Sequence, residues 1–261
     1  MPLMDMAMHA FIADVARQAG ALLLRYFRSS TLCGAPKGAW DLVTEADRAS
    51  EALIIAAVRA RFPDHDVFGE ETGRSGTAAR MLWLIDPLDG TLNFSRGLPI
   101  WGVSVALAEG DDVCYGAFFD PVHDEFFYAE RGVGATLNGQ AVRTSGATAL
   151  DQAFVYCAIA HETAVAEVAR RNVQRLWDRV MRLRMTGSVA SALAAVAAGR
   201  LDAAIELRGG PWDFAAGGLL VREAGGCTST FDGAPLMAAA GTVLAAATPT
   251  LHRALLDLLT P

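Results

Sequence analysis

The sequence contains few cysteines, and their spacing excludes two common kinds of small stabilised fold. Only four occur among the 261 residues: Cys33, Cys114, Cys157 and Cys227. No pair has the C-x-x-C spacing of zinc ligands, and nothing resembles a dense disulfide framework. We therefore expect free thiols in a reducing compartment, where they act as small apolar side chains.

Long apolar runs are also missing. No uninterrupted apolar stretch approaches the roughly 20 residues that a membrane-spanning helix needs. The first residues include Asp5 and Asp14 and no basic side chain before Arg17, which is the wrong charge order for a secretory signal. These absences predict a cytoplasmic protein that does not act at a membrane.

The sequence has no excess of basic charge. Its 22 lysines and arginines are outnumbered by 29 aspartates and glutamates, which gives a formal net charge of -7 at pH 7. A protein whose main ligand is nucleic acid normally carries a basic surface, so the composition predicts no nucleic-acid partner. A small phosphorylated substrate remains compatible with this balance, because bound metal ions can neutralise its charge.

Several standard catalytic motifs are absent too. The chain has no G-x-x-x-x-G-K-[ST] phosphate loop, no G-x-S-x-G nucleophile elbow and no H-E-x-x-H pair. Gly132-Val133-Gly134 lacks the third glycine of a dinucleotide fingerprint. The sequence therefore does not support the chemistries that those motifs serve.

Carboxylates are present where apolar segments end. Met81 to Ile85 is a short apolar run typical of a buried strand, and Asp86 and Asp89 follow it. Pro87 cannot donate to a sheet ladder and Gly90 adopts backbone angles closed to other residues, so we expect the chain to turn there. Two like charges so close together are unfavourable unless a cation lies between them. Oxygen ligands favour Mg²⁺, Ca²⁺ or Mn²⁺.

Further acidic residues occupy similar places. Glu70 and Glu71 follow another predicted strand, and Asp213 lies at the predicted start of a helix. Asp47 ends the sequence Thr44-Glu45-Ala46-Asp47, which has the form of a helix-capping box. Capping or turn formation is the alternative explanation for each single aspartate, and for Asp47 it is as good as a catalytic one.

The pattern of apolar residues divides the chain into two halves. Residues 1–150 combine predicted helices with alternating strands after Trp101, and Asn138-Gly139 predicts a tight hairpin. From about residue 151 to 261, strands alternate with helices. We expect an N-terminal α+β half with an antiparallel sheet and most metal ligands. The C-terminal α/β half would contribute Asp213 and the residues that select the substrate, with the site between the halves.

These motifs together resemble a known family. Gly69-Glu70-Glu71, the run from Asp86 to Thr91, and Trp212 to Gly217 are similar in order and spacing to the signatures of the inositol monophosphatase family, which are lithium-sensitive, magnesium-dependent phosphatases. The supporting matches are Asp41 to Asp47, Leu137-Asn138-Gly139, Thr186-Gly187-Ser188 and Glu223-Ala224-Gly225-Gly226. The resemblance is strongest to the bacterial inositol-1-monophosphatases, and it implies a five-layer αβαβα sandwich and a homodimer.

The resemblance also implies a set of metal ligands. One metal would be held by Glu70, Asp86 and the carbonyl of Leu88. A second would be held by Asp86, Asp89 and Asp213, and a third, weaker ion would touch Glu70. We therefore expect two or three Mg²⁺ ions per site, with Mn²⁺ as a substitute.

Roles in catalysis and binding follow from the same resemblance. Glu70 and Thr91 would orient the attacking water, with Asp47 behind Thr91. Trp212 is expected to pack and to position Asp213. Glu206 occupies the place of an acidic residue that contacts substrate hydroxyls, although a solvated residue at a strand end is the alternative. The substrate-binding residues would be Asp89, Gly90, Thr91, Gly187, Ser188, Glu206 and Asp213.

The expected reaction is magnesium-dependent hydrolysis of inositol 1-phosphate to inositol and phosphate by direct attack of water. A phosphorylated Asp86 or Asp89 is an alternative course. Fructose 1,6-bisphosphate, histidinol phosphate and 3′-phosphoadenosine 5′-phosphate are alternative substrates. A regulatory binding protein that keeps the fold is the alternative from a different class.

Overall fold

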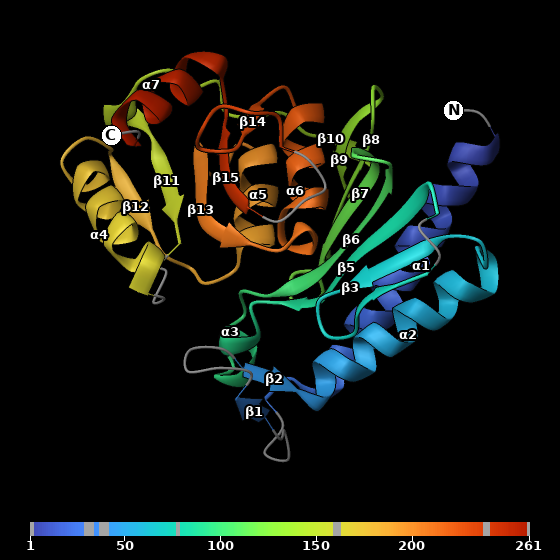
Figure 1. Cartoon of the computed structure of the whole chain (residues 1–261). Coiled ribbons are helices and arrows are strands. Elements are labelled where there is room, and N and C mark those ends of the chain that lie inside the picture. Colours follow the sequence, from blue (N-terminus) through green and yellow to red (C-terminus); the bar gives the residue numbers. More distant parts are fainter. Residues whose placement is uncertain are drawn as a thin grey trace.

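The computed structural model describes residues 3–28, 34–36, 42–76, 79–158, 163–236 and 241–259 (Figure 1). Cys33 and Asp41 lie outside these ranges. The described elements form five layers in the order helix, sheet, helix, sheet, helix, which confirms the predicted αβαβα sandwich (Figure 1). Apolar side chains fill each boundary between a helix layer and a sheet.

The first sheet has eight strands, in the order β10-β9-β8-β7-β6-β5-β3-β4. In chain order the strands are β3 (Asp66–Gly69), β4 (Gly73–Ser75), β5 (Met81–Asp89), β6 (Gly102–Glu109), β7 (Asp112–Asp120), β8 (Glu125–Glu130), β9 (Gly134–Leu137) and β10 (Gln140–Ala141). Helices α1 (Leu3–Tyr26) and α2 (Glu45–Arg61) cover its outer face, where Trp83 and Ile85 of β5 are buried. A short hairpin, β1 (Gly34–Pro36) with β2 (Leu42–Thr44), precedes α2.

Two features of this sheet differ from the expectation. The sheet is not wholly antiparallel, because β3 and β5 pair in parallel. The second difference is that β5 continues through Pro87 to Asp89 instead of ending at Ile85. The register with β6 shifts between Asp86 and Asp89, and this irregularity accommodates the missing N–H of Pro87. The turn comes one residue later, at Gly90.

Two local predictions are confirmed in this half. Thr44 caps α2, and the side chain of Asp47 completes the capping box by accepting from the backbone N–H of Thr44. Asn138 and Gly139 join β9 to β10 with positive φ angles of 47° and 78°, as a tight two-residue hairpin requires.

The second sheet has five strands, in the order β12-β11-β13-β15-β14. They are β11 (Phe154–Cys157), β12 (Arg182–Arg184), β13 (Ala203–Gly209), β14 (Cys227–Ser229) and β15 (Gly241–Ala246). Strand β11 pairs in parallel with β12 and β13, while β15 pairs antiparallel with β13 and β14. A short 3-10 turn, η1 (Leu150–Gln152), precedes β11.

Helices α5 (Val189–Ala197) and α6 (Pro211–Glu223) lie between the two sheets (Figure 1). Small residues let them pack closely: a Cβ at Gly116 of β7 would lie 2.8 Å from Cα of Ala216 in α6. Helices α4 (Thr163–Trp177) and α7 (Pro249–Leu259) cover the outer face of the second sheet. Within the described residues, no helix is both long enough and apolar enough to cross a membrane.

Candidate functional site

Three carboxylates converge from the end of β3, the last part of β5 and the start of α6. Glu70, Asp86 and Asp213 each offer an oxygen, and these oxygens lie within 4.8 Å of one another. Parallel strands end at the same sheet edge, and the pairing of Gly69 with Ile85 sets Glu70 beside Asp86. The N–H of Glu70 also donates to the carbonyl of Ile85 at 3.1 Å. The pairing of β3 with β5 therefore brings together two of the three carboxylates, Glu70 and Asp86.

Asp213 joins the cluster from the first turn of α6. Pro211 begins the helix, and the Asp213 carboxylate accepts a 2.6 Å hydrogen bond from the N–H of Gly210. Trp212 packs edge-on against Phe68 of β3, with ring centroids 4.8 Å apart. The carbonyl of Trp212 also accepts from the hydroxyl of Ser104 on β6. These contacts fix the start of α6 against the first sheet, as expected for a packing role of Trp212.

The cluster is electrostatically unfavourable without a cation. Burial raises the pKa of Asp86 well above its usual range, and the charges of Glu70, Asp89 and Asp213 raise it further. Burial has the same effect on the pKa of Asp213, again reinforced by neighbouring carboxylates. The donor set consists of carboxylate oxygens, which fits a hard divalent cation such as Mg²⁺ and does not favour zinc.

Asp89 lies at the end of β5, outside this group of three. Its Oδ2 atom accepts from the hydroxyl of Ser188 and from the N–H groups of Ala190 and Ser191 at 3.1 and 3.4 Å. Burial raises the pKa of Asp89 to about 6, against the opposing effect of these hydrogen bonds. Asp89 therefore ties the first sheet to the N-terminus of α5.

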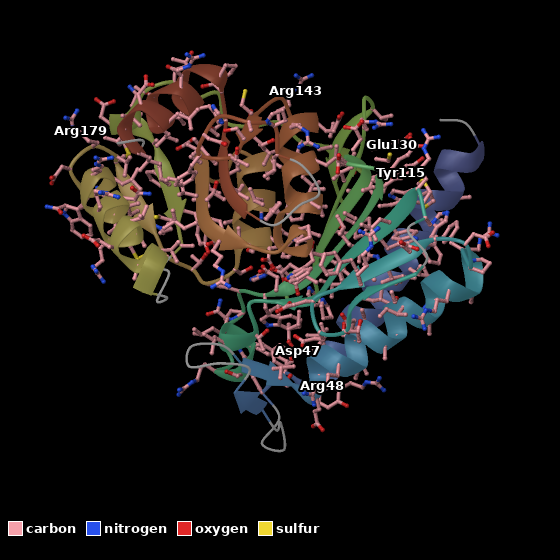
Figure 2. The ribbon with its side chains drawn as sticks, in the orientation of Figure 1. Asp47, Arg48, Tyr115, Glu130, Arg143 and Arg179 are labelled. Carbon is pink, nitrogen blue, oxygen red and sulfur yellow. The ribbon has the colours of Figure 1, made fainter. Side chains whose placement is uncertain are left out.

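Thr91 opens the short helix α3 (Thr91–Ser95), and its hydroxyl has two acceptors. Its Oγ1 atom lies 3.0 Å from Oδ1 of Asp47 and 3.0 Å from the carbonyl oxygen of Leu88. The other oxygen of Asp47 accepts from Thr44. The two readings of Asp47 are therefore compatible, because one carboxylate oxygen caps α2 while the other contacts Thr91. Figure 2 shows Asp47 at the end of α2 that lies towards α3.

Gly90, the N-cap of α3, is held in a position that only glycine fits. Its φ angle is 90°, and a Cβ there would lie 2.8 Å from the carbonyl oxygen of Ile100. It would also lie 3.3 Å from Cβ of Ser188. The close approach brings the D-G-T turn of the first half against the Gly187-Ser188 turn of the second.

A pocket of about 370 Å³ opens beside the carboxylates. Its lining residues are Asp89, Leu92, Tyr156, Cys157, Ala158, Met185, Gly187, Val189, Glu206 and Asp213. Glu206 lies on β13, where its Oε1 atom accepts from the N–H groups of Leu207 and Arg208 at 2.9 and 3.1 Å. Burial raises the pKa of Glu206 to about 7.

Comparison with known proteins gives the same family as these motifs. Residues 6–260 match the sequence profile of the "Inositol monophosphatase family". The "Nus factor SuhB" of Escherichia coli is 41% identical over 239 residues, 89% of this chain and 86% of that protein. "Inositol monophosphatase 2" of Solanum lycopersicum is 39% identical over 221 residues, 82% of this chain and 83% of that protein. The chain belongs to the inositol monophosphatase family.

A solved structure supports the assignment at the level of the fold. The extragenic suppressor protein suhB from Bartonella henselae superposes with a TM-score of 0.90 at 30% sequence identity. The alignment covers 97% of this chain and 98% of that one. The five-layer arrangement described here is thus the arrangement of a solved family relative.

In this family member, the structure brings most of the predicted site residues into one region. Asp89, Gly187, Glu206 and Asp213 line the pocket, and Gly90 lies against the Ser188 turn. Ser188 itself is buried and turns its hydroxyl to Asp89, so it does not line the pocket. Leu88 contributes its carbonyl to Thr91.

Sequence reasoning missed several residues of the region. Tyr156, Leu92 and Met185 line the pocket, yet each belongs to an ordinary apolar pattern in the sequence. Asn93 is a second case, because its side-chain amide donates to the carbonyls of Ile100 and Thr186 at 2.8 and 2.7 Å. The position of Asn93 two residues after Thr91 was the one available signal. The placement of the others depends on strand pairing that sequence spacing does not reveal.

Proposed function

We propose that this chain is a Mg²⁺-dependent phosphomonoesterase that hydrolyses inositol 1-phosphate to inositol and phosphate. The observation that carries the proposal is the Glu70, Asp86 and Asp213 cluster, which adjoins a pocket large enough for a small polyol. Family membership supports the same reaction class. A phosphate monoester is an anion, so this acidic site needs bound cations before it can accept the substrate.

Glu70, Asp86 and Asp213 would hold the Mg²⁺, with Asp89 and the carbonyl of Leu88 as further ligands by family resemblance. When bound, Mg²⁺ at such a site neutralises phosphate charge and makes water more acidic. The protein's own contribution is to hold the carboxylates close together before the metal arrives. Strands β3 and β5 and the start of α6 supply that rigidity.

Thr91 and Asp47 would form a hydrogen-bond chain that accepts a proton from the attacking water. The Thr91 hydroxyl has one proton, and donating it to the carboxylate of Asp47 leaves an oxygen lone pair to accept from water. Glu70 would orient the same water from the other side. The N–H groups of Gly90 and Thr91 would receive phosphate oxygens at the turn into α3.

The character of the pocket favours an alcohol without a second phosphate. Its described lining combines carboxylates with apolar side chains and includes no Arg, Lys or His. Hydroxyl groups of a polyol can donate to Glu206, whereas the second phosphate of fructose 1,6-bisphosphate or 3′-phosphoadenosine 5′-phosphate would be repelled. Histidinol phosphate stays a candidate, because its leaving group is cationic.

A substrate panel tests the proposal. Phosphate release from the four esters named above would be measured as kcat/KM with purified protein, in saturating Mg²⁺ and with a chelator. We expect inositol 1-phosphate to be preferred and chelation to stop turnover. A preference for either substrate with a second phosphate would contradict the substrate assignment, and no release from any ester would contradict the enzyme assignment.

Other expectations accompany this function. We propose that residues 1–150 and 151–261 act as two halves around the site, since the eight-stranded sheet lies in the first and the five-stranded sheet in the second. The homodimer, the cytoplasmic location, the absence of a nucleic-acid partner and inhibition by Li⁺ stay predictions.

A regulatory binding role is the second candidate. It is favoured by the name of the E. coli relative, "Nus factor SuhB", which describes something other than ester hydrolysis. The intact carboxylate cluster argues against binding as the sole role, because buried Asp86 beside two further carboxylates is costly unless a positive charge pairs with them. Absence of phosphate release throughout the panel would favour this second candidate.

A further inference from the structure

Helix α2 carries a second buried carboxylate, one turn after Asp47. Glu51 follows Asp47 by four positions, so the two side chains leave the same face of the helix. Both residues are only 1% exposed. Asp47 contacts Thr91, whereas Glu51 turns to the segment that follows β3 and carries Glu70.

The Glu51 side chain contacts the backbone on both sides of Glu70. Its Oε1 atom accepts from the N–H groups of Glu71 and Thr72 at 3.1 and 3.4 Å. On the other side, Gly69 leaves room for the carboxylate, because a Cβ at that position would lie 1.9 Å from Oε1. The residues immediately before and after Glu70 are thus both in contact with one buried side chain.

The other carboxylate oxygen makes Glu51 a costly side chain to bury. Oε2 is buried and accepts no hydrogen bond from the described residues. A buried carboxylate with one oxygen unsatisfied is a costly way to fill space in a core. The two hydrogen bonds that Oε1 accepts, from the N–H groups of Glu71 and Thr72, are the interactions that offset this cost.

We propose that Glu51 is a positioning residue, which holds the 69–72 turn so that the Glu70 carboxylate reaches Asp86 and Asp213 in the geometry that binds Mg²⁺. The proposal rests on the proposed function only for its effect on turnover. The role needs an acceptor oxygen at the right reach, and it does not need the negative charge. Strand β5 fixes the other side of the turn through the bond from Glu70 N–H to the Ile85 carbonyl.

Two conservative variants separate the effect of the length of the Glu51 side chain from the effect of its negative charge. Glu51→Gln keeps an oxygen at the position of Oε1 and removes the charge, while Glu51→Asp keeps the charge and shortens the side chain by one methylene. The same two changes at Glu45, an exposed residue at the start of the same helix, are the matched controls. All of these changes are small enough for the protein to fold, which thermal unfolding of the metal-free proteins checks.

The main readout is the Mg²⁺ dissociation constant, measured by calorimetric titration of metal-free protein with MgCl₂. We expect Glu51→Asp to weaken binding about tenfold or more, the scale typical of residues that orient metal ligands, and Glu51→Gln to stay within about threefold of the parent. The Mg²⁺ concentration that gives half-maximal phosphate release should rise in the same variant. Both Glu45 variants should match the parent.

Three results would overturn the proposal. They are unchanged Mg²⁺ binding in Glu51→Asp, a loss in Glu51→Gln as large as that in Glu51→Asp, and no Mg²⁺ binding by the parent protein. A parent protein that binds Mg²⁺ but releases no phosphate would contradict the proposed function instead. Calorimetry would still decide the role of Glu51 in that case.

Discussion

Oδ1 of Asp47, in the first turn of α2, lies 3.0 Å from the hydroxyl oxygen of Thr91, at the start of α3. The two residues are 44 positions apart in the sequence. Because the second oxygen of Asp47 caps α2, the position of the Thr91 hydroxyl is tied to the start of that helix. A change at Asp47 therefore affects helix capping and hydroxyl orientation through different atoms.

Asp47→Asn is expected to lower kcat about a hundredfold, which is a typical rate contribution for a group that assists proton transfer. The amide oxygen can still cap α2, but the NH₂ group would face Thr91. The Thr91 hydroxyl would then donate its proton to the Leu88 carbonyl. The melting temperature should therefore change little. Thr91→Ser is the control, because it retains the hydroxyl and should retain most activity. If the Asp47→Asn variant had the kcat of the parent protein, Asp47 would have no role beyond capping α2.

Asp89→Asn should abolish turnover while leaving the fold intact. Its amide oxygen can keep the hydrogen bonds from Ser188, Ala190 and Ser191, so α5 stays anchored. The NH₂ group then replaces the oxygen expected to bind metal, and the loss should appear mainly in kcat. Circular dichroism would check the fold. Activity within about threefold of the parent in saturating Mg²⁺ would rule out the metal role.

Glu206→Ala should separate substrate recognition from chemistry. Losing hydrogen bonds to a charged acceptor costs about 1.5 to 3 kcal/mol, so kcat/KM for inositol 1-phosphate should fall roughly tenfold to a hundredfold. An aryl phosphate, whose leaving group has no hydroxyls, should be hydrolysed at nearly the parental rate. Equal losses on both substrates would instead assign Glu206 to the metal site or the fold.

Glu206 should also make the stability of the metal-free protein depend on pH. Its pKa is raised from 4.5 to about 7, so the folded state binds more protons than the unfolded state between these values. This contribution to the free energy of unfolding is fully present below pH 4.5 and is lost as the pH rises through 7. Urea unfolding should show Glu206→Gln gaining stability over the parent at pH 8 but not at pH 4.5. An equal effect at both pH values would be inconsistent with a raised pKa.

The sequence was most informative where function depends on short stretches. The sequence indicates site elements in the D-x-x-D-G-T run, in the acidic pair after β3 and at the start of α6. It predicts the Asn138-Gly139 hairpin and the Thr44 cap from local chemistry alone. Each of these features is decided within a few residues. Local chemistry is what a single sequence expresses most directly.

Features that depend on pairing across the chain were not predictable in the same way. The short apolar run from Met81 to Ile85 indicates a strand, but it carries no sign of its parallel pairing with β3. The extension of β5 through Pro87 depends on a register shift against β6. Glu51 reads as one more acidic residue on an amphipathic helix, and its contact with the 69–72 turn emerges only when α2 is packed on the sheet.

The most direct test of the central claim is Mg²⁺-dependent phosphate release by purified, metal-free protein, compared with Asp213→Asn. Inositol 1-phosphate would be the substrate, and MgCl₂ would be added in steps. We predict no turnover without metal, saturable activation of the parent, and almost none in the variant despite an intact fold. Turnover by the metal-free parent, or an identical Mg²⁺ response in Asp213→Asn, would contradict a magnesium site built from Glu70, Asp86 and Asp213.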